Sequence, residues 1–414
     1  MLPPTPLLLL ILAGEAIFLL PFVLPRVFRP TFLAVFDITN LQLGTCVSLY
    51  GVIAIAAYLF GGPLADRFAP HKLMALGLAA TGLGGLYLTT LPGLYGLTLV
   101  YGFWGITTIL LFWAAMLRAT RLVGGRNNQG VAFGLLEGGR GLVSAIVSFV
   151  GVYALQWFFP EGPAFDIGEA DRITGFRNVV YVYSGLVLAA AVAIFFGMRK
   201  LPSGKDVQLP RIEWSQVIEL ARQPRLWLLA VIILSAYSCY RVLDDVSLLA
   251  SDVLNYDDVD ASLLASWSLL LRPMGAIAGG FLADRILASR ASGWAFALTA
   301  VGLLAVGVGP LGSYGVAMTW LALVVGGLGI FALRGIYFAL VAEARVPLVL
   351  TGTAIGLVST LGFLPDVYMP PLTGWLVDNF PYALGHRLVF LVGVAFAAIG
   401  AAAVFAFQRL SARH

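Results

Sequence analysis

The sequence predicts an all-α membrane protein of twelve transmembrane helices arranged as two six-helix halves. Its 414 residues are 60% hydrophobic and only 11% charged, with a mean hydropathy of +0.93, whereas a soluble domain carries about 25% charged residues. The charged residues are confined to short bursts between apolar stretches that are long enough to cross a bilayer. Because a soluble fold would need a charged surface to face water, we take the bilayer to be the solvent.

Twelve apolar stretches of about 20 residues, the length that crosses roughly 30 Å of hydrocarbon, can be placed along the chain. They are expected at residues 6–25, 42–62, 73–91, 95–117, 129–156, 179–198, 226–246, 262–283, 292–311, 316–342, 353–376 and 387–408. The first has no basic segment before it and no cleavage pattern after it, so we expect a retained helix rather than a signal peptide. An even number of spans places both termini on one side of the membrane.

The basic residues predict which side this is, because Lys and Arg collect in cytoplasmic segments. With both termini in the cytoplasm, sixteen of the 25 Lys and Arg fall in cytoplasmic segments. Five fall in the periplasmic loops, namely Arg26, Arg29, Arg172, Arg177 and Arg387. We therefore expect a multi-pass protein of the bacterial cytoplasmic (inner) membrane with cytoplasmic termini.

A polar stretch, Arg199–Arg225, divides the spans into six and six, and it includes a short amphipathic segment, Arg211–Arg222. The expected organisation is an N-terminal six-helix bundle at 1–198, a cytoplasmic linker at 199–225 and a C-terminal six-helix bundle at 226–414.

The two halves repeat each other at matching positions. Gly62-Pro-Leu-Ala-Asp-Arg follows the second span, and Gly280-Phe-Leu-Ala-Asp-Arg follows the eighth. Likewise, Gly130-Val-Ala-Phe-Gly-Leu and Gly352-Thr-Ala-Ile-Gly-Leu lie at the starts of spans five and eleven. Such a pair of repeats indicates an internal duplication, which is typical of secondary transporters.

The Gly-x-Leu-Ala-Asp-Arg loop resembles the signature loop of the major facilitator superfamily, and the six-plus-six layout matches that family along the whole chain. The resemblance implies the fold of that family, with two pseudo-symmetric bundles. It also implies a secondary active transporter, not an enzyme, that moves a small solute by alternating access. In the outward-facing state the loop residues would latch the cytoplasmic ends of the two halves together, as a carboxylate at a helix end can pair with Arg. The alternative is that these are solvated loop charges. They are Asp66, Arg67, Asp284 and Arg285.

The likeness to particular groups within that family is weaker. Span four lacks the Arg and span five lacks the Gly-Pro motif of the proton-driven drug antiporters, which argues against multidrug efflux. Arg272, in the middle of span eight, is similar to the anion-binding Arg of the oxalate/formate antiporter group. The basic residue that this group carries on span eleven is missing here, where Asp366 is the charge in mid-span. The likeness supports an anion site without naming oxalate.

Five ionisable residues are expected near the middle of the membrane, where such residues are functional candidates by default. They are Glu15, Glu137, Arg140, Arg272 and Arg334. Glu137 and Arg140 lie three residues apart on one helical face and can form a local, structural ion pair. The seam between spans five and eight is expected to be closely packed and to be where the halves rock, because small residues let helix backbones approach. These residues are Gly134, Gly138, Gly141, Gly275 and Gly279.

Arg272 and Arg334 have no acid within four positions on their own helices. Each needs either an acid from another helix (Glu15, Glu137 or Asp366) or a substrate. Three Arg against two Glu leave one positive charge if both Glu are ionised and two if one takes a proton, and an anionic ligand would neutralise this charge. Because Arg binds carboxylate or phosphate in bidentate fashion, we predict that Arg272, Arg334 and Arg140 contact an anionic substrate.

The outer third of span seven predicts a periplasmic gate. Arg241 has Asp244 and Asp245 three and four residues further on, which predicts a self-satisfied ion pair, or else a substrate contact. Tyr237 and Tyr240, in the same stretch, can line the gate and the substrate or belong to the interfacial aromatic belt.

Three acids are candidates for coupling transport to protons. Glu15 has no cation on its own helix, so burial is expected to favour its protonated form when the anion binds Arg272. Glu137 and Asp366 are further candidates, and the prolines around Asp366 predict a bend or gate in span eleven. Coupling by proton symport and by exchange for a counter-anion both stay open.

Several other classes of protein are not indicated. Cys46 and Cys239 lie inside apolar runs, and the three His, at 71, 386 and 414, fall in expected loops or at the terminus, so no disulfide, metal site or cofactor is predicted. The net charge of +4 belongs mostly to loops and does not indicate nucleic acid. We expect a monomer. A permease or exporter for a neutral, zwitterionic or amphipathic solute remains the alternative, whereas an enzyme, scramblase or sensor has no supporting motif.

Overall fold

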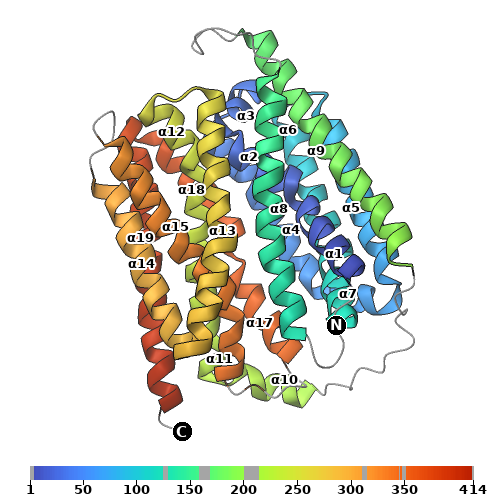
Figure 1. The fold of residues 1–414 in the computed structure, drawn as a ribbon, viewed down its shortest axis with the longest axis vertical. Helices are drawn as coiled ribbons and strands as arrows, with labels where there is room; N and C mark the ends of the chain where they lie inside the picture. Colours follow the sequence, from blue (N-terminus) through green and yellow to red (C-terminus); the bar gives the residue numbers. More distant parts are fainter. Residues whose placement is uncertain are drawn as a thin grey trace.

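The computed structural model describes residues 4–124, 129–157, 168–199, 214–309, 315–344, 346 and 351–412. Over these residues the chain forms helices that join into twelve rods, in two bundles of six that stand side by side (Figure 1). The labelled N- and C-termini lie toward the same end of the molecule. We call this end the terminus side and the opposite end the far side. The predicted fold class is confirmed.

The first six rods form the N-terminal half. In chain order they are α1 (Pro4–Phe18), η1 (Leu19–Val23), α2 (Leu24–Val27) and α3 (Arg29–Phe36) as rod one; α4 (Asn40–Arg67); α5 (Pro70–Leu88); α6 (Leu94–Gly105), η2 (Ile106–Trp113) and α7 (Ala114–Gly124) as rod four; α8 (Gln129–Gln156); and α9 (Glu169–Gly197).

The C-terminal half follows a short helix, α10 (Trp214–Ala221). Its rods are α11 (Pro224–Val242), η5 (Leu243–Asp245) and α12 (Val246–Leu254) as rod seven; α13 (Asp258–Ile286); α14 (Ala288–Val308); α15 (Val316–Ile336), η6 (Tyr337–Ala339) and α16 (Leu340–Glu343) as rod ten; α17 (Thr351–Gly362) and α18 (Pro365–Asn379) as rod eleven; and α19 (Tyr382–Ala412).

Ten of the described helical segments are long and apolar enough to cross a membrane. The other two rods are the Gly-rich α5 and rod eleven, whose helix stops after Gly362 and restarts at Pro365. Span eleven is therefore interrupted near its prolines: the break lies just before Pro365, which begins α18, whereas Pro370 and Pro371 lie inside that helix.

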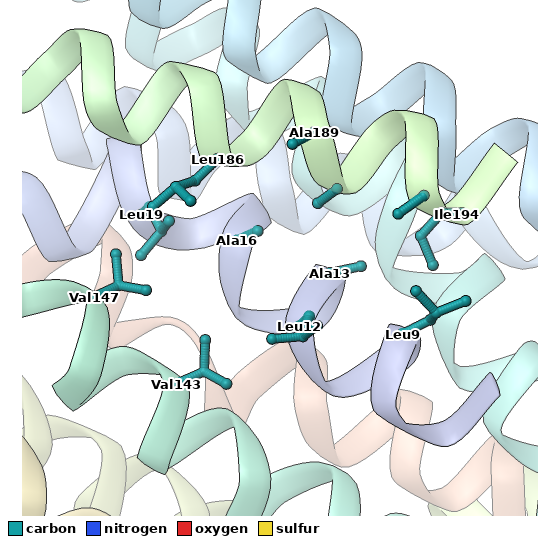
Figure 2. Close-up of a pocket in the computed structure, with 12 residues that line it drawn as sticks. Leu9, Leu12, Ala13, Ala16, Leu19, Val143, Val147, Leu186, Ala189 and Ile194 are labelled. Carbon is teal, nitrogen blue, oxygen red and sulfur yellow. The ribbon is translucent and has the colours of Figure 1, made fainter. Parts of the chain in front are cut away.

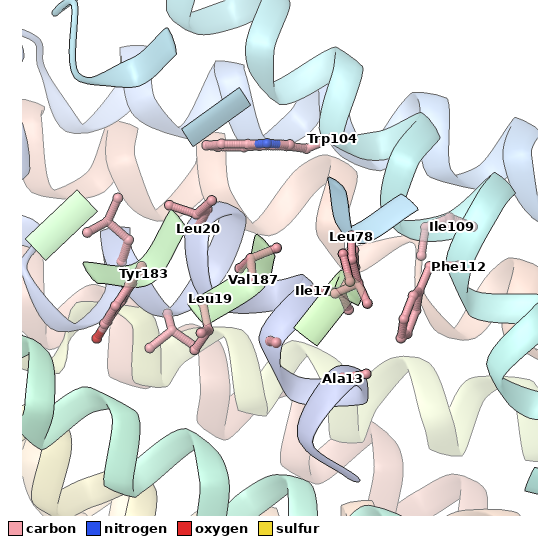
Figure 3. Close-up of a cluster of buried hydrophobic side chains, with 14 of the residues drawn as sticks. Ala13, Ile17, Leu19, Leu20, Leu78, Trp104, Ile109, Phe112, Tyr183 and Val187 are labelled. Carbon is pink, nitrogen blue, oxygen red and sulfur yellow. The ribbon is translucent and has the colours of Figure 1, made fainter. Parts of the chain in front are cut away.

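Each half packs around its own apolar core. Figure 3 shows part of the N-terminal core, where Ile17 and Leu20 of rod one lie among Trp104 of α6 and Tyr183 and Val187 of α9. The exact division at 1–198, 199–225 and 226–414 stays a prediction, since residues 200–213 of the linker lie outside the described residues.

Several rods are longer than the apolar stretches that predicted them. Rod one was expected to end at residue 25 but continues to Phe36, and rod seven continues from the expected 246 to Leu254. The prediction that five arginines lie in periplasmic loops is wrong, because all five lie within helices: Arg26 in α2, Arg29 in α3, Arg172 and Arg177 in α9, and Arg387 in α19. Hydropathy detects only the part of a helix that faces hydrocarbon, whereas these extensions are covered by protein or reach water.

The halves meet at two seams, α8 against α13 and α4 against α18. On the far side the seams are tight. A Cβ added to Gly44 would collide with the backbone of Pro370, and one added to Gly51 would lie 2.8 Å from the carbonyl oxygen of Asp366. The α4/α18 seam is therefore closed by backbone-to-backbone contact.

Toward the terminus side the seams open. On α8 a Cβ at Gly141 would lie 2.9 Å from the Cγ of Arg272, but at Gly138 and Gly134, one and two turns closer to the terminus side, it would meet nothing within 4 Å. Gly62 and Gly356 in the other seam also face open space. Over the described residues, the structure is thus closed on the far side and open on the terminus side. The prediction that Gly275 and Gly279 pack in the α8/α13 seam is wrong, because both face α15.

Candidate functional site

Four charged residues from three helices meet where the α8/α13 seam closes; we call Glu15, Glu137, Arg140 and Arg272 the central cluster. Arg272 Nη1 donates to Glu15 Oε1 at 3.1 Å and Oε2 at 3.2 Å. Arg140 Nη1 donates to Glu137 Oε1 at 2.6 Å, and Arg140 Nε lies 3.4 Å from Glu15 Oε2. Arg272 Nη2 lies 3.8 Å from Glu137 Oε2. The cluster therefore joins α1 and α8 of one half to α13 of the other.

The central cluster contains two carboxylates and two guanidinium groups and is neutral when all four are charged. Glu15, Arg140 and Arg272 are 2%, 4% and 7% exposed, and charges buried this deeply are tolerated only when they are paired. The side chain of Glu137 differs from the other three, because it is 44% exposed. One carboxylate of the cluster therefore faces open space.

The contacts of the central cluster answer two questions that the sequence left open. The local pair of Glu137 with Arg140 is confirmed. For Arg272, the alternative of an acid from another helix is the one that the structure shows. Glu15 has no cation on its own helix, as the sequence shows, but two guanidinium groups reach it from α8 and α13. Its role as a proton carrier stays a prediction.

Arg334 of α15 has a different environment. It is partly buried, and it has no salt bridge to any carboxylate that the structure describes. Its guanidinium carbon lies 4.0 Å from the ring centre of Tyr240 and 5.5 Å from that of Tyr237, both on α11. Glu137 is among the charged groups that act electrostatically on it. A guanidinium stacked on aromatic faces keeps its N–H donors free for a ligand.

A second charged group closes the far side; we call Arg26, Arg29, Arg241, Asp244 and Asp366 the far-side cluster. Asp244 accepts from Arg26 Nε at 2.5 Å and from Arg241 Nη1 at 2.7 Å, so one carboxylate bridges the two halves. Arg241 Nε lies 3.0 Å from Asp366 Oδ1. Arg29 donates to the Asn40 side chain at 3.0 Å and to the Asp244 carbonyl at 3.2 Å. A hollow of about 30 Å³ lies beside these side chains.

Further polar contacts tie the same end together. Asp378 of α18 accepts from the backbone N–H groups of Asn40 and Leu41 at 3.1 and 2.7 Å, at the N-terminus of α4, where a carboxylate is stabilised by the helix dipole. Asp258 of α13 accepts from Thr31 and Arg172 at 3.0 Å each. The far side is therefore sealed across both seams.

The sequence missed the far-side roles of Arg26 and Arg29, which are only 5% and 6% exposed. The predicted pairing of Arg241 is right for Asp244 and wrong for Asp245. The Asp245 carboxylate lies 2.7 Å from Nδ1 of His386, whose Nε2 lies 3.2 Å from Asp252. The prediction that His71 and His386 lie in loops is also wrong, because both lie in helices, α5 and α19, and are buried.

The signature-loop residues lie at the open end. Arg67, Asp284 and Arg285 are exposed, and Arg285 stacks on Phe281 of its own helix at 4.1 Å. The side chain of Asp66 lies outside the described residues. The latch stays a prediction, because it concerns a state in which this end is closed.

An apolar hollow of about 250 Å³ lies between α1, α8 and α9 (Figure 2). Its labelled lining includes Leu9, Leu12, Val143, Val147 and Leu186. A site for a polar solute needs a few placed polar groups to orient it, and this hollow is lined by aliphatic side chains alone. The hollow therefore lacks the groups that would orient a polar solute.

Two bundles that are sealed at one end and open at the other, with buried charges at their seam, define a transporter that works by alternating access. The comparisons with known proteins agree: the sequence pattern of the Major Facilitator Superfamily matches residues 7–365. The chain belongs to the major facilitator superfamily.

Two curated relatives come from Escherichia coli (strain K12). The inner membrane protein YihN is 26% identical over 98% of this chain and 95% of its own length, and the inner membrane protein YqcE is 26% identical over 89% and 86%. Among solved structures, an inward-facing, unoccupied bacterial homologue of the human lysosomal transporter Spinster has a TM-score of 0.76, with 15% identity over 98% of this chain and 96% of its own. The nucleoside transporter NupG has a TM-score of 0.74, with 13% identity over 97% and 98%.

The family establishes that the chain is a secondary transporter and not an enzyme. The relatives and the apolar helices establish a multi-pass inner-membrane protein that acts on a small-molecule substrate.

Proposed function

We propose that this protein transports a small organic anion, either a carboxylate or an acidic or phosphorylated sugar, and that Arg334 binds it. The observation that carries this proposal is the position of Arg334 beside the seam, partly exposed and without a described carboxylate partner. Arg is the side chain best suited to bind carboxylate or phosphate oxygens in bidentate fashion.

The charge balance at the centre supports an anion. The central cluster is neutral by itself, so Arg334 adds one uncompensated positive charge to that region. An anion on Arg334 would restore neutrality and would remove the cost of keeping that charge away from water. We therefore place Arg334 ahead of Arg272 and Arg140 as the substrate contact, and we assign Tyr237 and Tyr240 to the wall of the same site.

We propose that the terminus side is cytoplasmic and that the structure represents an inward-open state. The excess of Lys and Arg at the terminus side supports this orientation. The high structural similarity to a transporter described as inward-facing supports the state. On this assignment Arg241, Asp244 and Asp245 belong to a closed periplasmic gate, and the four signature-loop residues would engage when the cytoplasmic end closes.

We propose proton symport as the coupling, with exchange against a counter-anion as the other form. Among the three candidate acids, Glu15 contacts two guanidinium groups and Asp366 contacts Arg241, whereas Glu137 faces open space. A carboxylate that water can reach is the one that can take up and release a proton. Uptake driven by a pH gradient should therefore be lost in Glu137→Gln, and unchanged pH dependence in that variant would remove Glu137 as the carrier.

One observation favours a neutral or zwitterionic solute or an exported amphipath instead. The charges of the central cluster pair with each other, as expected of residues that only hold the halves together.

A thermal-shift screen of the purified protein separates these functions. Carboxylates, sugar phosphates and neutral sugars would be compared on the wild type, on Arg334→Gln and on Arg290→Gln, which changes an exposed arginine at the terminus side. We expect anions to stabilise the wild type and Arg290→Gln but not Arg334→Gln. Anions that stabilise no protein, or that stabilise Arg334→Gln equally, would contradict the proposal.

A further inference from the structure

We infer that the substrate is a hydroxylated monoanion of the sugar-acid type, which places its carboxylate on Arg334 and its hydroxyl groups on Glu137. This inference rests on the proposed function, because it takes Arg334 as the anion site. It adds the chemistry of the rest of the ligand, which Arg334 alone does not define.

Glu137 is the acceptor that faces this ligand. It lies deep between the halves, yet its side chain is 44% exposed, and Gly134 and Gly138 on either side of it in the sequence face open space. Its Oε1 is held by Arg140 at 2.6 Å, whereas its Oε2 has only a distant contact with Arg272 at 3.8 Å. One carboxylate oxygen therefore retains accepting capacity toward the open space, and an ionised carboxylate accepts from hydroxyl donors.

Glu137 and Arg334 belong to opposite halves and to two helices, α8 and α15, that contact each other. A ligand that touches both must carry a negative group at one end and hydrogen-bond donors at the other. It would also bridge the N-terminal and C-terminal halves, as alternating access requires of a substrate that drives closure.

The net charge of the site indicates which of the ligands with hydrogen-bond donors would bind. When Glu137 is ionised, Glu15, Glu137, Arg140, Arg272 and Arg334 together carry one positive charge, so a monoanion neutralises the region and a zwitterion does not. A dianion would set its second carboxylate against Glu137, and like charges at short range are repulsive. A simple fatty monoanion would leave the free oxygen of Glu137 without a donor.

Four types of probe of similar length test this inference by thermal shift and isothermal calorimetry on the purified full-length protein. They are hexonates (gluconate, mannonate and galactonate), hexanoate, sorbitol and glucarate. At least one hexonate should bind about tenfold more tightly than hexanoate, the effect of one hydrogen bond to a charged group. Sorbitol, without the carboxylate, and glucarate, with a second one, should both bind more weakly than that hexonate.

Glu137→Gln is the informative variant, and Arg290→Gln is its matched control. In Glu137→Gln the advantage of the hexonate over glucarate should shrink by about tenfold, because the repulsive charge is gone. Arg290→Gln should keep the wild-type order of affinities. Unfolding curves in the absence of ligand would identify a variant that fails to fold, and Glu137→Asp, which retains the charge, should then restore the preference.

The outcomes separate this inference from the function on which it rests. If hexanoate or glucarate binds the wild type as well as every hexonate, the hydroxylated-monoanion assignment is wrong while the anion site on Arg334 stands. An unchanged ratio of hexonate affinity to glucarate affinity in Glu137→Gln would have the same meaning. If no anion binds the wild type, the proposed function and this inference both fail.

Discussion

The centre of this transporter contains two arginine sites that look alike in the sequence and differ in space. Arg272 on α13 and Arg334 on α15 both lie within apolar helices with no acid within four positions. Arg272 finds Glu15 at 3.1 Å and Glu137 at 3.8 Å, whereas Arg334 stacks on Tyr240. The first site is a neutral group of charges that joins the halves, and the second is a cation without a salt bridge to any carboxylate that the structure describes.

The difference shows that one residue type is stabilised in two ways in the same bilayer. Arg272, which joins the halves, is matched by an opposite charge in the protein, because the membrane offers no other compensation. Arg334 has no described carboxylate partner and is stabilised by weaker means, namely aromatic faces and partial exposure. The local sequence shows that either charge is costly inside the membrane, but it does not show which group compensates that charge.

The largest expected effect is on the free energy of unfolding, and it distinguishes the Arg272 site from the Arg334 site directly. Arg272→Met leaves Glu15 buried with a weaker partner and should cost about 3–5 kcal/mol, as breaking a buried ion pair does. Arg334 forms no salt bridge with a described carboxylate, so Arg334→Met breaks none. It should lower the free energy of unfolding by less than about 1 kcal/mol. Unfolding of both variants in the same detergent measures the difference. Equal losses would show that Arg334 is also a structural charge.

The next effect concerns the gate. Asp244→Asn weakens the one carboxylate that joins Arg26 to Arg241 across the halves, at a cost of about 2 kcal/mol to the closed far side. A cysteine placed at the buried Thr31, with Cys46 and Cys239 replaced, should then react faster with a thiol reagent. Asp378→Asn, at the other seam, should act in the same direction. Unchanged labelling in both would mean that backbone packing alone closes the gate.

A smaller effect comes from the histidine of the far side. Both ring nitrogens of His386 lie within hydrogen-bonding distance of carboxylates, Asp245 and Asp252, so both bonds form only when the ring carries both protons. Raising the pH should therefore remove one bond and lower stability by about 1 kcal/mol. Asp252→Asn can donate to the neutral ring and should flatten this dependence, while His71→Gln should not. Parallel pH profiles of the wild type and Asp252→Asn would exclude the histidine as the cause.

The smallest effect follows the α8/α13 seam. Gly134→Ala places a methyl group in open space and should be neutral or stabilise by up to about 1 kcal/mol, since alanine is the better helix former. Gly141→Ala places its methyl group 2.9 Å from Arg272 and should lose that gain as the arginine shifts. Thermal unfolding of the two variants shows which of them is more stable. The reverse order would mean that the seam is closed at Gly134 rather than at Gly141.

The fold was largely predictable from the sequence, and the site was predictable only in part. The apolar runs gave twelve spans, and the repeated Gly-x-Leu-Ala-Asp-Arg loop gave the family, because both are written in contiguous residues. The Glu137–Arg140 pair could also be predicted, since both residues lie on one helical face. Arg26 and Arg29 were misplaced, because hydropathy does not reveal that a second bundle covers the end of rod one.

The sequence by itself determined the solvent, the number of spans, the internal duplication and the residue types that had to be explained inside the membrane. The tertiary structure alone decided which of those charges cancel. Glu15 and Arg272 are 257 residues apart, and Arg26 and Asp244 are 218 apart, yet their charged atoms lie only 3.1 and 2.5 Å from each other. Hydrophobic length is a local property of the chain, whereas charge compensation depends on helix packing, and only that packing shows that Arg272 is matched and Arg334 lacks a described carboxylate.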